Sequence, residues 1–190
     1  MSRVHKGFTI VELIIVIVII AILAIITATI YQSVQVQARD AQMSDAATKV
    51  ADAIQLFASK NGHFPAGGWG SSTAIGAGTE CSNGVNGWFA SGLYTCTVED
   101  TLKASGYLPA GFAANLPANT KYTSPNTLAL MVYIYSGNLA MVYYSMESPS
   151  TSDTNHFNAQ LTKCGINPAG TVTQRDSYGM RNGICFSYAN

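Results

Sequence analysis

An apolar run at residues 8–30 constrains this chain more than any other feature of its sequence. Between Leu13 and Ile26 the run contains no polar residue at all. Over its full length the polar residues are Thr9, Glu12, Thr27 and Thr29. These 23 residues would form a helix of about 35 Å, which is long enough to cross the roughly 30 Å hydrocarbon core of a bilayer. The run therefore predicts a membrane-spanning helix.

The residues that precede the run predict its orientation and a processing site. Arg3 and Lys6 would hold the N-terminus in the cytoplasm and place the bulk of the chain outside. An ordinary secretory signal is cut at small residues after its apolar region, but here the small residue Gly7 stands directly before that region. Cleavage after Gly7 would remove a charged leader and leave the apolar helix on the mature protein.

Glu12 is unusual because an ionisable group inside a membrane helix costs a few kcal/mol. Two interpretations are open. Glu12 lies within two turns of the cytoplasmic end, so its side chain could reach back to the interface. Alternatively, cleavage after Gly7 would create an amino group on Phe8, and pairing with that group on a neighbouring copy would offset the burial of both charges.

The stretch Lys6-Gly7-Phe8-Thr9-Ile10-Val11-Glu12-Leu13, followed by apolar residues to Ile26, resembles the class III signal of type IV prepilins. That family also includes the pseudopilins of type II secretion and the competence pilins. The resemblance implies that a prepilin peptidase cuts between Gly7 and Phe8, that Phe8 is N-methylated, and that Glu12 guides assembly.

The sequence departs from many pilins at two positions of the apolar run. It has no proline near Thr29 and no glycine near Ala21. Such residues would permit the helix to unwind locally inside a filament.

The helix is predicted to continue well beyond the apolar run. Neither proline nor glycine occurs from Phe8 to Lys60, and apolar or small residues then recur at a spacing of three and four, which predicts one buried stripe. The stripe consists of Met43, Ala47, Val50, Ile54 and Phe57. We expect one helix of about 53 residues, with two helices bent near residues 31–39 as the alternative, and Asn61-Gly62 as its end.

The C-terminal part contains alternating apolar patterns that predict antiparallel strands. Residues 127–135 and 139–146 would form a hairpin about Ser136-Gly137-Asn138, and residues 185–188 a last strand. Both faces of the hairpin are apolar, so we expect one face on the long helix and the other against a neighbour or a covering loop.

Two short helices are also expected in this part. The first runs from about Val98 to Ser105, where Thr97 and Asp100 resemble a capping box. The second ends near Lys163 and would be capped by Asp153 or Thr154.

The four cysteines all follow the apolar run; they are Cys81, Cys96, Cys164 and Cys185. None stands in Cys-x-x-Cys spacing and no histidine accompanies a cysteine pair, which argues against a zinc site. An even number of cysteines beyond an export segment favours two disulfides. Of the three possible pairings we favour Cys81–Cys96 with Cys164–Cys185, because short loops close most readily.

Composition and motifs argue against several other functions. The formal net charge is +0 and 11% of the residues are charged, so no specific nucleic-acid site is evident. The sequence contains no Gly-x-Ser-x-Gly elbow, His-Glu-x-x-His motif, phosphate loop or EF-hand spacing. Asp153 and Asp176 are too few and too far apart for calcium. We therefore expect no catalytic residues, no cofactor and no metal.

Together these features and the resemblance predict an α+β pilin fold, in which a long N-terminal helix packs against a small antiparallel sheet. The expected segments are a leader at residues 1–7, a transmembrane and filament-core helix at 8–30, and the amphipathic second half of that helix at 31–60. Residues 61–190 would form a globular head that ends in a disulfide-bounded loop.

The function that the resemblance implies is a structural subunit of a type IV pilus, which serves adhesion, twitching motility or DNA uptake. Its implied partners are further copies in a helical filament, prepilin peptidase, and the pilus assembly platform with its ATPase. Before assembly it would be a single-pass protein of the cytoplasmic membrane with its head outside, and afterwards part of an extracellular pilus. The alternatives are a pseudopilin of a secretion or competence system, and an uncleaved membrane-anchored binding protein.

Overall fold

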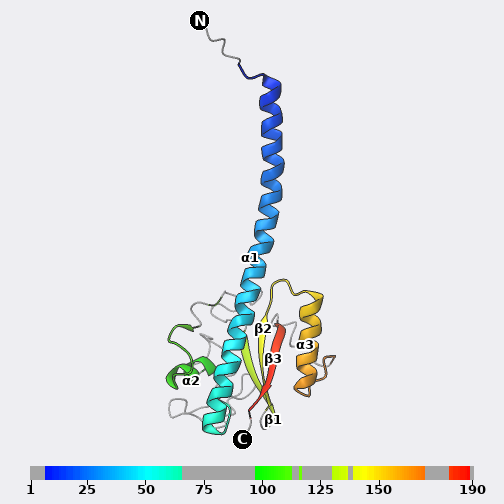
Figure 1. The fold of residues 1–190 in the computed structure, drawn as a ribbon. Helices are drawn as coiled ribbons and strands as arrows, with labels where there is room; N and C mark the ends of the chain where they lie inside the picture. Colours follow the sequence, from blue (N-terminus) through cyan, green and yellow to red (C-terminus); the bar gives the residue numbers. More distant parts are fainter. Residues whose placement is uncertain are drawn as a thin grey trace. The chain divides into compact units, whose positions relative to one another are not determined.

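The computed structural model describes residues 7–65, 97–112, 116, 130–136, 139–169 and 180–188. The chain divides into two units, Met1–Ala38 and Arg39–Asn190. The elements are α1 (Ile10–Asn61), α2 (Val98–Ala104), β1 (Leu130–Ser136), β2 (Leu139–Ser145), α3 (Thr151–Lys163) and β3 (Met180–Ser187), as Figure 1 shows. The predicted α+β class, with a long N-terminal helix and a small antiparallel sheet, is confirmed.

Helix α1 is one helix of 52 residues, so the prediction of a single helix is confirmed and the two-helix alternative is not found. It ends where the sequence predicts, at Asn61, because Gly62 follows with a φ of 74°. A left-handed backbone at that position suits glycine, which has no Cβ to clash. The predicted stripe from Met43 to Phe57 is buried, and the first buried residue of α1 is Asp40.

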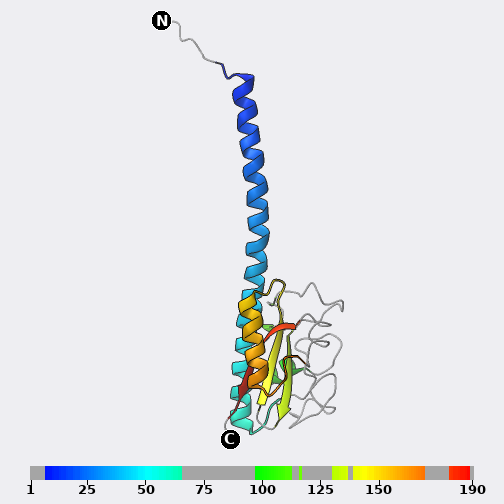
Figure 2. The same cartoon turned by 90° about the vertical axis from the view of Figure 1, so that its right-hand side faces the viewer.

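The three strands form one antiparallel sheet in the order β1-β2-β3. Side chains alternate between its two faces, as a pleated strand requires. One face, which includes Val132 and Val142, packs with the buried stripe of α1. The other face, which includes Met131 and Met141, packs with α3. Figure 1 shows β3 between the C-terminal part of α1 and α3, and in Figure 2, which is turned by 90°, α3 lies in front and overlaps α1.

The second face of the sheet is covered by a helix of the same chain and not by a loop. Phe157 and Leu161 stand four residues apart on α3, so both reach the sheet from one side of the helix. The predicted cap of this helix was wrong. Ser150 is the N-cap, and Asp153 is the third helical residue of a capping box.

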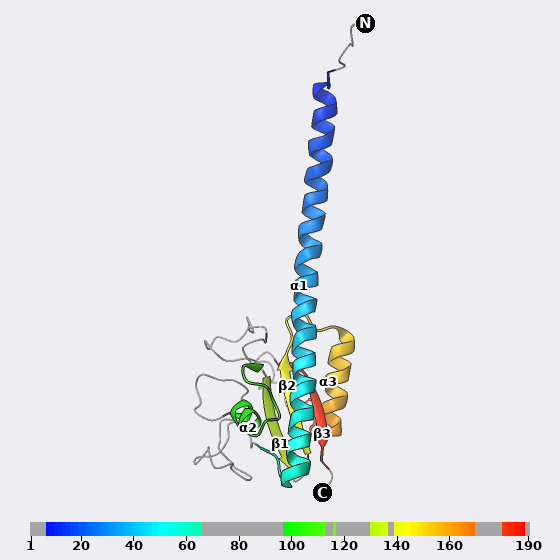
Figure 3. The same ribbon diagram turned by 60° about the vertical axis from the view of Figure 1, so that its left-hand side comes forward.

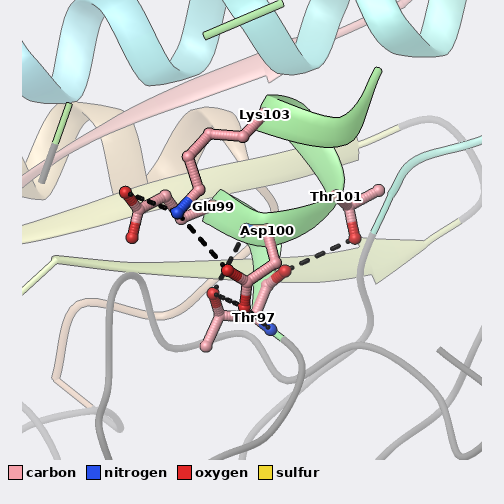
Figure 4. Close-up of polar contacts among 5 residues, drawn as sticks. All are labelled: Thr97, Glu99, Asp100, Thr101 and Lys103. Atoms are coloured by element: carbon pink, nitrogen blue, oxygen red, sulfur yellow. Dashed lines mark hydrogen bonds and ion pairs between the residues drawn. The ribbon is translucent and has the colours of Figure 1, made fainter. Parts of the chain in front are cut away.

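The predicted capping box of α2 is confirmed (Figure 4). The Asp100 carboxylate accepts hydrogen bonds from the Thr97 amide and hydroxyl, both at 2.9 Å. Glu99 is buried and pairs with Lys103 at 3.3 Å. Partial burial lowers the pKa of Lys103, but Glu99 first and then Asp100 more than offset this and raise it above its usual value. Figure 3 shows α2 on the β1 side of the sheet and α3 on the β3 side.

The strand and turn predictions are confirmed in part. The last strand is longer than predicted, since it begins at Met180. Residues 127–129 and the hairpin turn at 137–138 lie outside the described residues.

Gly183 is a point of close packing between β3, β2 and α3. A Cβ placed there would lie 2.5 Å from Met141 Cε, 2.9 Å from the Val142 carbonyl oxygen and 3.3 Å from Phe157 Cε2. We therefore expect Gly183→Ala to lower the free energy of unfolding by about 1–3 kcal/mol. Urea unfolding of the full chain in detergent measures this, with Ser187→Ala on an exposed position of the same strand as control. Equal stability of Gly183→Ala and the control would contradict the packing argument.

The capping box at the start of α3 should make the free energy of unfolding depend on pH. Hydrogen bonds from the Ser150 hydroxyl and amide hold the pKa of Asp153 below its usual value. A carboxyl whose pKa is lowered by folding stabilises the fold at neutral pH, and this contribution is lost as the pH falls through its folded pKa. Asp153→Asn should therefore be less stable than the unaltered protein at neutral pH, and the difference should shrink below about pH 4.

Urea midpoints at neutral and acid pH test this expectation. Asp52→Asn, which alters an exposed residue of α1, is the control for general charge effects. A stability difference for Asp153→Asn that is the same at both pH values would show that the carboxylate is not the cause.

Candidate processing and assembly segment

The segment that contains the predicted cleavage site lies immediately before α1. Gly7, Phe8 and Thr9 are outside any helix or strand, and α1 begins at Ile10. Gly7 is exposed, and the Phe8 side chain is 83% exposed. The Gly7–Phe8 peptide bond is thus accessible and free of helical hydrogen bonding, the condition that a peptidase needs to reach it.

Thr9 and Glu12 form a capping box at the start of α1. The Glu12 carboxylate accepts hydrogen bonds from the Thr9 amide at 2.8 Å and from the Thr9 hydroxyl at 2.7 Å. The Thr9 hydroxyl in turn accepts from the Glu12 amide at 3.3 Å. The backbone amides of Thr9 and Glu12, which have no acceptor within the helix, are both satisfied in this way. Glu12 therefore has a local partner within its own chain.

The rest of the apolar run is also exposed. Its large apolar side chains are 49–83% exposed from Phe8 to Ile30. α1 has the length and the apolarity of a helix that could cross a membrane. Such a surface needs lipid or other apolar helices around it, since water would make its exposure costly.

The other polar groups of the run bond to the helix itself. The Thr27 hydroxyl donates to the Leu23 carbonyl oxygen, and the Thr29 hydroxyl donates to that of Ile26 at 2.9 Å. Glu12 is the one charged residue between Phe8 and Ala38. It is thus the group of this segment best able to attract a cation from another molecule.

Inside the unit Arg39–Asn190, two charged residues join α1 to the segment between β2 and α3. Asp40 is 6% exposed, and its two carboxylate oxygens accept from the backbone amides of Glu147 at 2.7 Å and Ser148 at 3.0 Å. Arg39 donates to both oxygens of Glu147, at 2.7 and 2.9 Å. This hydrogen bonding raises the pKa of Arg39 above its usual value.

Cys164 and Cys185 form a disulfide between the end of α3 and β3. It is one of the two disulfides that the favoured pairing predicts. Cys81 and Cys96 lie outside the described residues, so their pairing stays a prediction. Among the described residues there is no group of three or more histidine, cysteine, aspartate or glutamate side chains that could hold a metal.

Two of these interactions were not predicted from the sequence. The capping role of Thr9 could have been found, because Thr-x-x-Glu is the spacing of a capping box. The role of Asp40 could not, because its partners lie 107 and 108 residues further along the chain.

Comparison with known families identifies the same N-terminal segment. Residues 2–28 match the family described as the prokaryotic N-terminal methylation motif. This motif is the class III signal peptide, the hallmark of type IV pilins and pseudopilins. The resemblance drawn from the sequence is therefore confirmed over these residues. No curated protein and no solved structure matched the chain.

The motif supports a type IV pilin or pseudopilin, and it points to a structural subunit and not to an enzyme. It implies processing by a prepilin peptidase and assembly into a pilus-like filament. Together with the apolar helix it fits a protein that is first anchored in a membrane and then assembled at the surface.

Proposed function

We propose that this chain is a structural subunit of a type IV pilus, which polymerises through the first half of α1. The observation that carries the proposal is an exposed apolar helix within the match to the N-terminal methylation motif, which spans residues 2–28. Residues 1–7 are the leader, residues 8–30 cross the membrane and later line the filament core, and residues 31–60 complete the helix. Residues 61–190 form the head, whose surface makes contacts for adhesion, motility or DNA uptake.

Burial of the apolar surface supplies the energy of assembly. A helix that leaves lipid for a fibre in water keeps its apolar side chains covered only by packing against other copies. Each Å² of apolar surface kept from water contributes about 25 cal/mol. This term is non-directional, so a specific polar contact has to set the register between copies.

Glu12 sets that register in our proposal. Cleavage between Gly7 and Phe8 frees an amino group, which is then N-methylated and still carries a positive charge. Within one chain, Thr9 satisfies the Glu12 carboxylate with neutral donors only. A cationic terminus on an adjoining copy is a stronger partner in an apolar surrounding, because hydrogen bonds between charged groups are about twice as strong as neutral ones.

Electron microscopy of filaments sheared from cells that express this chain tests the proposal. We expect long filaments in which the chain is the dominant protein. The motif is common to pilins and pseudopilins, so the filaments also separate these two roles. Absence of surface filaments, with the processed chain retained in the membrane fraction, would favour a pseudopilin and contradict the pilus role.

A further inference from the structure

Strand β3 lies at one edge of the sheet formed by the described strands. On an edge strand, the backbone groups of every second residue face away from the neighbouring strand and are open to pairing with another chain. In β3 these residues are Gly183, Cys185 and Ser187, since each bonds a side chain at this edge.

Side chains from three elements occupy this edge. The Cys185 amide donates to Gln160 Oε1 at 2.9 Å, and Lys163 Nζ donates to the Cys185 carbonyl oxygen at 2.9 Å. The Gly183 amide donates to Asn182 Oδ1 at 2.9 Å. Gln55 of α1 donates to the Ser187 carbonyl oxygen at 3.4 Å. Four outward backbone groups over five residues are thus already bonded.

Helix α3 supplies the two bonds at Cys185, and it is held firmly in place. Its Phe157 ring contacts the Tyr143 ring edge to face at 6.0 Å, and Gly183 lets the helix lie close to β3. The disulfide joins Cys164, the residue after α3, to Cys185 itself. Gln160 and Lys163 are therefore kept beside the backbone that they cover.

We infer that Gln160 and Lys163 close the outer edge of β3, so that the heads of two copies do not join there by strand addition. Copies held in one membrane at high local concentration would otherwise present this edge to each other. Contacts between the heads of two copies would then use surfaces other than the edge of β3. The inference rests on the head alone and does not depend on filament formation.

The double variant Gln160→Met, Lys163→Met tests this inference in the full chain, purified in detergent with its disulfide intact. Methionine keeps the side-chain length and removes both hydrogen-bonding groups. The control is Asn155→Met, Thr162→Met, which adds two methionines at exposed positions of the same helix. Hydrogen exchange of the Cys185 amide and sedimentation equilibrium are measured for both variants and for the unaltered protein.

We expect the Cys185 amide of the double variant to exchange about tenfold faster at low concentration. At high concentration the variant should form dimers in which this amide is protected again, while the control stays like the unaltered protein. Association no greater than that of the control would overturn the inference. Should the double variant unfold, the single variants Gln160→Met and Lys163→Met provide the same comparison, and an unchanged Cys185 exchange rate in Gln160→Met would also overturn it.

Discussion

Glu12→Ala should yield a protein that is processed and held in the membrane but does not form filaments. Removing the carboxylate would leave the Phe8 amino group of an adjoining copy buried without a partner. The loss of one member of a buried ion pair typically costs about 3–5 kcal/mol. Because this cost recurs at every contact along a fibre, filament yield should fall below detection. Immunoblots of sheared filaments and of membranes measure the two pools.

Two further variants separate the pairing of Glu12 from its capping role. Glu12→Gln keeps an acceptor for the Thr9 amide, since glutamine serves in a capping box, but it removes the charge. Thr9→Val removes the cap, which costs about 0.5–2 kcal/mol, and keeps the charge. We expect Glu12→Gln to fail in assembly and Thr9→Val to assemble. The opposite pattern would mean that Glu12 acts only through the start of α1.

Asp40→Ala should destabilise the head by about 2–5 kcal/mol. The substitution removes the charged acceptor of the Glu147 and Ser148 amides. A hydrogen bond to a charged group contributes about 1.5–3 kcal/mol, and the half-buried Glu147 and exposed Ser148 regain part of this from water. Asp40 is also the first buried residue of α1, so its loss should loosen the head where burial of the helix begins. Urea unfolding of the full chain in detergent measures the change.

Asp45→Ala is the matched control for Asp40→Ala. Asp45 lies on the same helix and pairs with Lys49 at 2.6 Å, but its side chain is 64% exposed. Exposed pairs of this kind contribute about 0–1 kcal/mol. An Asp40→Ala protein as stable as Asp45→Ala would show that the buried carboxylate does not hold the segment after β2.

The parts of this fold that local patterns determine could be predicted from the sequence. The apolar run is continuous over 8–30, and the stripe from Met43 to Phe57 repeats at helical spacing. Gly62 ends α1 because glycine tolerates a left-handed backbone. The capping box of Thr97 and Asp100 depends on residues three apart. In each case the interactions that determine the element are made by residues close together in the sequence.

The parts that depend on distant residues could not be predicted. Ser150, Asp153 and Thr154 are all good capping residues, and only the packing of Phe157 and Leu161 on the sheet fixes where α3 begins. The same packing covers the second face of the sheet with α3, where a neighbour or a loop was expected. At the candidate site, the sequence predicts roles for Gly7, Phe8 and Glu12, but the partner that Glu12 would meet in a filament belongs to a second copy.

In the proposed function the bond between Gly7 and Phe8 is cut and the new terminus is methylated. Both steps can be tested by the intact mass of the mature protein, taken from the membrane or surface fraction of a host with a prepilin peptidase. We expect a mass that lacks residues 1–7 and gains one methyl group, with Phe8 as the first residue. A mature chain that still begins at Met1 or Ser2 would contradict this proposal, because Glu12 would then have no amino group on Phe8 to meet.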